Sequence, residues 1–242
     1  MGKADLHVHT RVSDGIATPE QVVDYAEHAT DLDVIAVVDH EDVGGGLRAR
    51  EHALRMGYMV EVIPGAEITT LQGHVVGLFI EETPASFRRI ESTLEDIHAL
   101  GGIATIPHPM SWLTRSVSER TLRRLALIPD RRYRADALEI YNPSPAGRQS
   151  ASRAAVLNAH TLRLPIIGGS DAHHLAHIGT GWTRFAGRTG QELREAILAG
   201  SVSGEMSGYP SLRETGLVQV IVGLGWGYTA TPRKLAKRAA RR

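Results

Sequence analysis

The chain has 242 residues and no formal net charge, and its composition is that of an ordinary globular protein, 42% hydrophobic and 22% charged. It contains no cysteine, which excludes disulfide bonds and thiolate metal sites, so any metal would need nitrogen and oxygen ligands. The start of the chain has no signal-peptide pattern, and no apolar run approaches the roughly 20 residues of a membrane span. A cytoplasmic location without membrane contact is therefore expected.

Seven apolar runs are predicted to be β-strands. They are rich in Val and Ile and nearly continuous in hydrophobic character, as strands buried on both faces usually are. In chain order they are DLHVH (5–9), DVIAVVD (33–39), VEVIPGAEIT (60–69), HVVGLFI (74–80), GIATIPH (102–108), DALEIYN (136–142) and LPIIGGSD (164–171).

Helical patterns with capping signals lie between these strands. In TPEQVVDYAEHA, Thr18 is the predicted N-cap and Gln21 completes a capping box; Thr189 and Glu192 repeat the pattern in a later helix. The segment 86–101 places Phe87 and several aliphatic residues at helical spacing. Other helices are predicted within 116–127, 147–160 and 189–200.

Strand and helix alternate about seven times, which predicts an α/β fold with a parallel sheet. The sheet could be a closed (β/α) barrel or an open doubly wound sheet. We expect one domain over residues 1–205 and a C-terminal extension over 206–242. That extension contains a glycine-rich apolar patch and a basic tail, which is either a solvated helix or a contact for nucleic acid or membrane.

Almost every predicted strand carries a histidine or a carboxylate at or beside its end. In α/β folds, function gathers at the carboxyl ends of strands, and His7 and His9 share a face because side chains alternate along a strand. Burying so many polar groups without partners would cost several kcal/mol per group. We therefore predict a metal site. The candidate ligands are His7, His9, Asp14, His40, Glu67, His74, His108, Asp171 and His173.

Nine ligands are more than one ion needs, so two or three divalent ions are expected, of Zn, Mn or Fe. Glu67 is a candidate to bridge a pair of ions, and Asp39 is expected to orient His40 or its neighbours by hydrogen bonding. Three ions balanced by three carboxylates and a hydroxide would leave about two positive charges. That excess suits a phosphate dianion better than a neutral ester or amide.

The motifs DLHVHT…SDG, VVDH, IPHP and GSDAH, with GAEIT and GHVVGLF between the second and third, resemble those of the PHP (polymerase and histidinol phosphatase) family. The match spans roughly residues 4 to 205. The resemblance implies a distorted, TIM-like (β/α)7 barrel that hydrolyses phosphoesters through a hydroxide bridging two metal ions. The implied ligand sets are His7, His9, Glu67 and Asp171 for one ion; Glu67, His74 and His108 for a second; and Asp14, His40 and His173 for a third.

Among these ligands Glu67, Asp171 and His173 are the candidate catalytic residues. The segment around residues 18–46 looks closest to a branch of which some members act on nucleoside bisphosphates and short RNA. Those relatives have a helical insertion before the HP motif, whereas only about thirty residues separate His74 from His108 here. The expected substrate is thus a phosphomonoester or phosphodiester of a small metabolite, nucleotide or short oligonucleotide, and no obligate protein partner is evident.

Two other functions stay open. Amidohydrolases also begin with an HxH strand; their carbamylated-lysine version is excluded because no lysine lies between Lys3 and Lys234, but a carboxylate-bridged version is not. A non-catalytic metal-binding PHP scaffold is the second alternative.

Two arginines in loops beyond strand ends, Arg115 and Arg148, are candidates to bind substrate phosphate, since guanidinium groups suit phosphate oxygens. The alternative for each is an ordinary surface arginine. Trp112 is expected to cover the barrel mouth rather than line a pocket, and VGGG (43–46) to form a tight entry into the next helix.

Overall fold

A computed structural model describes residues 1–208 and 210. Of the predicted C-terminal extension, the glycine-rich patch and the basic tail lie outside the described residues. Within the described part, no helix combines the length and apolar character needed to cross a bilayer. The helices are α1 (Pro19–Ala29), α2 (Gly44–Met56), α3 (Ile90–Ala99), α4 (Glu119–Ala126), α5 (Pro145–Leu157) and α6 (Gly190–Ala199), with short turns η1 (Arg131–Tyr133), η2 (Asn158–Leu162) and η3 (Leu175–His177).

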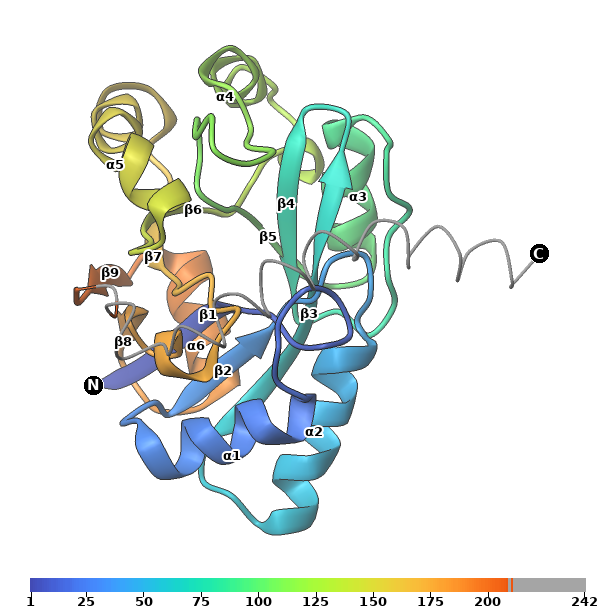
Figure 1. Cartoon of the computed structure of the whole chain (residues 1–242). Helices are drawn as coiled ribbons and strands as arrows, with labels where there is room; N and C mark the ends of the chain where they lie inside the picture. The colour runs from blue at the N-terminus through green and yellow to red at the C-terminus, as the bar shows by residue number, and fades with distance from the viewer. Residues whose placement is uncertain (209, 211–242) are drawn as a thin grey trace.

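In the described part of the chain, nine strands form one sheet that curls into a nearly closed barrel (Figure 1). Their order is β7-β6-β5-β4-β3-β2-β1-β8-β9. An isolated parallel bridge between Val8 and Ala172 brings the chain after β7 back beside β1. The strands are β1 (Gly2–Val8), β2 (Val34–Val37), β3 (Glu61–Thr70), β4 (Gly73–Leu78), β5 (Ile103–Ile106), β6 (Ala137–Tyr141), β7 (Ile166–Gly168), β8 (Gly181–Phe185) and β9 (Ser203–Met206).

The predicted α/β barrel is confirmed, but its sheet is mixed, so the expectation of a parallel sheet holds only for some of the strand pairs. The pairs β1–β2, β2–β3, β5–β6 and β6–β7 are parallel, but β4 runs antiparallel to both its neighbours. The cause is local: only Leu71 and Gln72 separate β3 from β4, and such a short connection makes a hairpin rather than a crossover. Strands β8 and β9, which we did not predict, add an antiparallel edge beside β1.

The capping signals are confirmed. Thr18 with Gln21 and Thr189 with Glu192 form reciprocal capping boxes at the first turns of α1 and α6. The prediction for 86–101 is wrong at its start, because α3 begins only at Ile90. Phe87 precedes the helix with a left-handed backbone, φ 57°, and its side chain is exposed rather than part of the apolar face.

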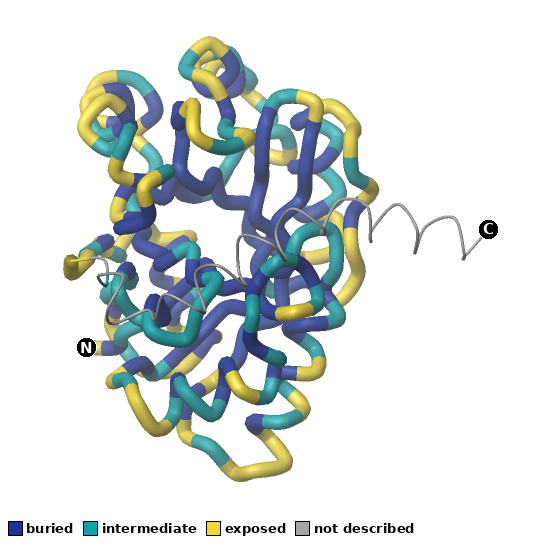
Figure 2. The backbone as a smooth tube through the Cα atoms, viewed as in Figure 1, coloured by how far each residue is buried: buried dark blue, intermediate teal, exposed yellow. Residues whose placement is uncertain are grey.

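The core lies between the strands and the surrounding helices. Figure 2 shows the strands buried in the centre, while the outer faces of the helices are exposed. Leu6 of β1 packs with Phe185 and with Leu193 and Ile197 of α6. His7 and His9 alternate with Leu6 and therefore face the opposite side of β1. Apolar packing on one side of this strand thus holds its two imidazoles in place on the other.

Candidate metal centre

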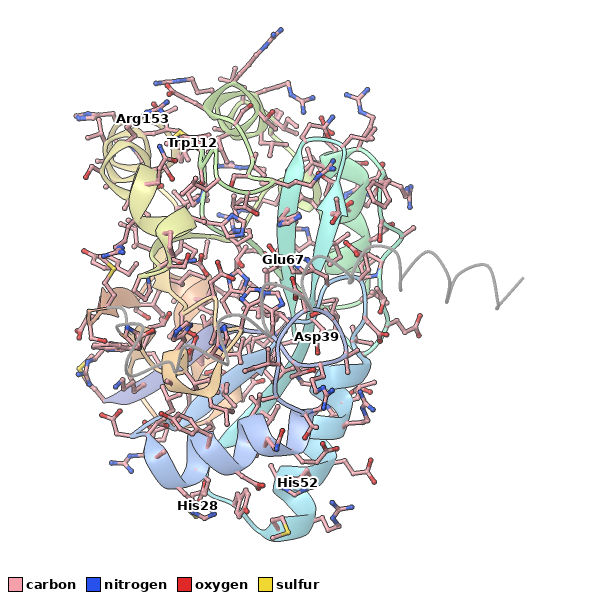
Figure 3. All side chains as sticks on the ribbon, viewed as in Figure 1. His28, Asp39, His52, Glu67, Trp112 and Arg153 are labelled. Carbon is pink, nitrogen blue, oxygen red and sulfur yellow. The ribbon has the colours of Figure 1, made fainter. Side chains whose placement is uncertain are left out.

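All nine predicted ligands lie in one cluster at the end of the barrel where the parallel strands terminate. His7 is in β1, and His9 and Asp14 follow it. The others come from the loops after β2, β5 and β7 and from the β3–β4 hairpin, which supplies both Glu67 and His74. Figure 3 shows Glu67 in the middle of the molecule, surrounded by side-chain nitrogens.

Four atoms form a first group: Nε2 of His7, Nε2 of His9, Oε2 of Glu67 and Oδ1 of Asp171. The two nitrogens are 3.1 Å apart. They lie 3.5 and 3.4 Å from the Glu67 oxygen, and each is 3.6 Å from the Asp171 oxygen. Ligands about 2.0–2.1 Å from a tetrahedral ion are separated by about 3.3 Å. These spacings are therefore those of a coordination shell around one ion.

The second group uses the other oxygen of Glu67. Its Oε1 is 2.8 Å from Nδ1 of His74 and 3.1 Å from Nε2 of His108. The two oxygens of one carboxylate thus face two different groups, which is the arrangement of a bridging ligand. Glu67 is only 1% exposed, so this carboxylate has little access to solvent.

The third group is centred on Asp14. Its Oδ2 is 3.4 Å from Nε2 of His40 and 3.3 Å from Nε2 of His173. The Nδ1 atom of His40 is 3.4 Å from Oε2 of Glu67, so this imidazole stands between the third group and the first. The side chains of His40, Asp14 and His173 are 15%, 18% and 33% exposed, whereas His7 and His9 are fully buried. A substrate would therefore approach from the side of the third group.

Three of the histidines make a hydrogen bond through Nδ1, on the side of the ring that faces away from the cluster. Nδ1 of His173 is 2.9 Å from the backbone carbonyl of Asp171, to which it can only donate. Nδ1 of His7 lies 2.8 Å from a carboxylate oxygen of Glu139, and Nδ1 of His108 lies 2.9 Å from Oγ of Ser116. Donation from Nδ1 leaves the lone pair of Nε2 directed at the cluster, as metal-binding histidines require.

The donor set fits divalent cations. Nδ1 of His9 and Nδ1 of His74 are buried without a hydrogen-bond partner among the described residues, although buried polar atoms are normally paired. For His74, the nearby Glu67 oxygen is close enough but does not complete a hydrogen bond. Imidazole and carboxylate donors together suit Zn, Mn or Fe. We conclude that the cluster can hold divalent metal ions.

The charges of the cluster are mutually dependent. Burial favours neutral imidazole, but the carboxylates of Asp171 and Glu67 outweigh it and raise the pKa of His9 to about 10. Burial also opposes charge on Glu67, yet His74 and His40 hold the pKa of that carboxyl well below its usual range. Without cations, protons on the imidazoles balance the carboxylates in the region that cations would otherwise fill.

Asp39 shapes the loop that carries Asp14, and among the described residues its carboxylate accepts hydrogen bonds from this loop rather than from His40. Its Oδ1 accepts from the backbone of Thr10 at 2.8 Å and from Oγ of Ser13 at 2.6 Å. The same Ser13 hydroxyl lies 2.9 Å from Oδ1 of Asp14. Asp39 is therefore placed to position Asp14.

Glu139 was missed by the sequence analysis. This buried carboxylate of β6 accepts from Nδ1 of His7, from the backbone of His108 at 3.0 Å and from Nδ2 of Asn142 at 2.7 Å. It thereby links a ligand of the first group to one of the second. The available signal was a carboxylate inside DALEIYN, the strand whose end carried no candidate ligand.

Two ligands are presented by unusual backbone. His108 has φ 29° and Asp171 has φ 54°, values that non-glycine residues rarely adopt. Such conformations cost about 1–3 kcal/mol each and persist where the surroundings enforce them, often at functional sites.

The predicted substrate residues lie outside this cluster. The Arg115 guanidinium stacks over the ring of Phe87, with its centre 5.9 Å from the ring centroid, and the Arg115 carbonyl accepts from the backbone of His74. Arg148 is exposed on α5. No carboxylate of the described residues pairs with either arginine. Trp112 is 76% exposed, so it projects into solvent instead of covering the barrel.

Comparison with known proteins identifies a matching family model, several sequence relatives and several similar solved structures. A model described as PHP-associated matches residues 149–202. An uncharacterized protein of Methanocaldococcus jannaschii is 33% identical over 129 residues, which is 49% of this chain and 74% of that protein. The 5′-3′ exoribonuclease Rnm of Escherichia coli is 40% identical over 83 residues, 33% of this chain but only 28% of that enzyme.

Among solved structures, a two-domain protein of Bacteroides vulgatus, described as containing a predicted PHP-like metal-dependent phosphoesterase, matches with a TM-score of 0.65. It is 20% identical, and the match covers 84% of this chain and 64% of that one. At this identity the likeness concerns the fold alone.

Proposed function

Because this chain belongs to the PHP family of metal-dependent phosphoesterases, we propose that it hydrolyses a phosphomonoester or phosphodiester of a small phosphorylated metabolite or nucleotide. The observation that supports this most is the geometry of Glu67. Its two oxygens face two separate sets of ligand atoms at distances of 2.8 to 3.5 Å. Neighbouring cation positions bridged in this way suit in-line displacement at phosphorus.

The charge of the cluster favours a phosphate. The carboxylates of Asp14, Glu67 and Asp171 contribute three negative charges, and two or three divalent cations would exceed them. The surplus is positive and attracts a dianion, whereas a neutral ester or amide would leave it uncompensated. We propose two or three ions of Mn, Zn or Fe, held by the three groups described above, in a protein located in the cytoplasm.

We assign the following roles in cation binding and hydrolysis to the residues of the cluster. Glu67 would offer one carboxylate oxygen to a cation in the first group and the other to a cation in the second, and Asp171 would contribute one oxygen to the first group while its second oxygen accepts from Ser144 at 3.2 Å. His173 stands at the most exposed side, with Nε2 directed inward. Bound cations would activate a water molecule as the nucleophile and neutralise the phosphate oxygens. Arg115 and Arg148 remain candidates to hold further phosphate oxygens.

The test is hydrolysis of p-nitrophenyl phosphate and its bis-ester by the purified protein loaded with Mn²⁺, Zn²⁺ or Fe²⁺. We expect turnover of at least one ester, and comparison of the two separates monoesterase from diesterase activity. Elemental analysis of the same samples gives the metal content. Bound metal without turnover of either ester would contradict the proposal and favour a non-catalytic scaffold.

A further inference from the structure

Two candidate ligands, Asp171 and His173, lie on the loop that joins β7 to β8, residues 169–180 (Figure 1). Asp171 belongs to the first group of ligand atoms and His173 to the third, so this loop contributes to two cation positions. Apart from the turn η3 and the bridge of Ala172 to Val8, residues 169–180 lie outside helices and strands. The shape of the loop therefore depends on its contacts with other elements.

Asp5 of β1 is a fully buried carboxylate that contacts both ends of this loop. Its Oδ1 accepts from the backbone N–H of Ser170 at 2.9 Å, and its Oδ2 accepts from the backbone N–H of Gly179 at 2.8 Å. Oδ1 also accepts from the backbone of His7 at 3.3 Å. An ionised carboxylate suits this place because it only accepts hydrogen bonds, and these three partners only donate. Asp5 thus joins the start and the end of the loop to the strand that carries His7.

The start of the loop determines how Asp171 is presented. Ser170 directly precedes Asp171, whose left-handed backbone, φ 54°, needs surroundings that enforce it. One residue further on, the carbonyl of Ala172 accepts from the backbone of His9 at 2.9 Å. The main chain of Asp171 is therefore fixed on both sides, by Asp5 through Ser170 and by the end of β1 through Ala172.

The far end of the loop closes at a glycine. Gly179 has φ 77°, a conformation that glycine adopts without steric cost, and its N–H can therefore reach Asp5. His173 lies between the two fixed ends, and its Nδ1 donates to the carbonyl of Asp171 at 2.9 Å. The position of this imidazole thus follows from the backbone that Asp5 holds.

We propose that Asp5 is a positioning residue of the metal centre: by holding both ends of the 170–179 loop, it places Asp171 and His173 for the cations of the first and third groups. It is not a ligand itself, because its two oxygens accept from backbone N–H groups. The inference rests on the metal centre that the proposed function requires, but not on which ester is hydrolysed.

The experiment compares Asp5→Asn with a matched control, Asp136→Asn, at the opposite end of the barrel. Asp136 also accepts from a backbone N–H, that of Ala104 at 2.8 Å, and it contacts His98. In Asp5→Asn the amide NH₂ would face a backbone N–H, so one end of the loop loses its partner. Hydrogen exchange of the metal-free proteins in EDTA, followed by mass spectrometry, should be roughly tenfold faster within 170–179 for Asp5→Asn and unchanged there for the control.

Titration with Co²⁺ then measures the effect on the metal centre. Asp5→Asn should lower the affinity for Co²⁺ about tenfold, because the carboxylate and imidazole of the loop are no longer held in place. The d–d absorption spectrum of the bound Co²⁺, which reports its ligands and coordination number, should change as well. The control should match the wild type in both respects, although it loses a buried hydrogen bond of the same kind.

A second variant, Gly179→Ala, tests the far end of the loop and serves if Asp5→Asn does not fold. The added methyl group would meet Leu32 at 3.6 Å, an ordinary contact, so the side chain fits. The left-handed backbone is unfavourable for alanine, however, and this strain weakens the hold on the loop. We expect a fall in Co²⁺ affinity of about threefold and a spectral change in the same direction.

Unchanged affinity and spectrum in folded Asp5→Asn, or in Gly179→Ala where only that variant folds, would overturn the proposal. Equal losses in Asp5→Asn and Asp136→Asn would overturn it too, since they would reflect general stability. A wild-type protein that binds no Co²⁺ would refute the metal centre and with it the proposed function. If the wild type binds Co²⁺ but hydrolyses no ester, only the proposed function fails, and the titration still decides the role of Asp5.

Discussion

Among the described residues, two groups of histidine and carboxylate can be compared, and only the one in the barrel has the geometry of a metal centre. The other lies where α1 and α2 meet, in the part of the molecule where Figure 3 marks His28 and His52. There Nε2 of His52 is 2.7 Å from Asp24, and the Tyr58 hydroxyl donates to the same oxygen at 2.9 Å. These polar atoms already satisfy one another.

In the barrel cluster, by contrast, Nδ1 of His7, His108 and His173 each has a hydrogen-bond partner behind the ring, and Nε2 of each faces the other candidate ligand atoms. His7 is an example. Its Nδ1 is hydrogen-bonded to the Glu139 carboxylate, and its Nε2 faces three other candidate ligand atoms. Residue type alone therefore does not make a metal site. What matters is whether donor atoms converge with their lone pairs unused.

A direct test of this contrast changes one carboxylate in each cluster. Glu67→Gln should abolish phosphoesterase activity and bound metal together, because an amide cannot offer two anionic oxygens to two cations. Asp24→Asn, the matched control on α1, should change neither. Activity assays with elemental analysis give the result; full activity in the Glu67→Gln variant would refute the bridging role.

A smaller loss of metal affinity is expected when Glu139, the hydrogen-bond partner behind His7, is changed. Glu139→Gln keeps the shape of the side chain but weakens the hold on His7 and His108, so metal affinity should fall about 10- to 100-fold. Titration with Zn²⁺ or Mn²⁺ against a competing chelator measures it. Far-UV circular dichroism of the metal-free variant checks the fold. Unchanged affinity in a folded variant would mean that Glu139 does not act on the ligands.

Metal binding should also release protons. In the metal-free protein, although burial favours the neutral form, the neighbouring carboxylates raise the pKa of His9 to about 10 and that of His7 well above its usual value, so both imidazoles bind a proton more tightly than free histidine does. A cation must displace those protons, and its apparent affinity should therefore rise with pH. Calorimetric titrations in two buffers of different ionisation enthalpy report the number released. Identical heats in both buffers would contradict this picture.

The smallest effect is expected for the stability of the protein when Asp24, the carboxylate that contacts His52 and Tyr58, is changed. Asp24 is 45% exposed at its side chain, and ion pairs of this kind contribute roughly 1 kcal/mol or less. Asp24→Asn should therefore lower the free energy of unfolding by at most about that amount. Urea denaturation measures it. A loss several times larger would show that this cluster has a structural importance its exposure does not suggest.

Local signals in the sequence were the most reliable guide to the fold. The capping box of Thr18 and Gln21 involves residues three apart, and helix α1 begins where it indicated. Phe87 misled the prediction because its position matched the helical period although its backbone is left-handed. Strands β8 and β9 were missed since β8 alternates buried with half-buried residues and β9 is a four-residue edge strand.

The convergence of the candidate ligands could be anticipated because most of them lie at or shortly after the ends of predicted strands, and strand ends converge in a barrel. Glu139 could not be identified in the same way. Its partner His7 is 132 residues away, and only the closed sheet brings the two together. Likewise the contact between Asp39 and the loop of Asp14 depends on how two loops fold over one another.

The central position of Glu67 determines how the centre is loaded. Its carboxylate contacts imidazoles of all three groups: His7 and His9, His74 and His108, and His40. A cation that enters one group withdraws charge from an oxygen pair on which the others depend, and it orders that carboxylate for its neighbours. If more than one cation binds, their occupancies would therefore be thermodynamically linked, and each ion would alter the affinity for the next. Binding of several cations would then be cooperative, with the coupling carried by the Glu67 carboxylate.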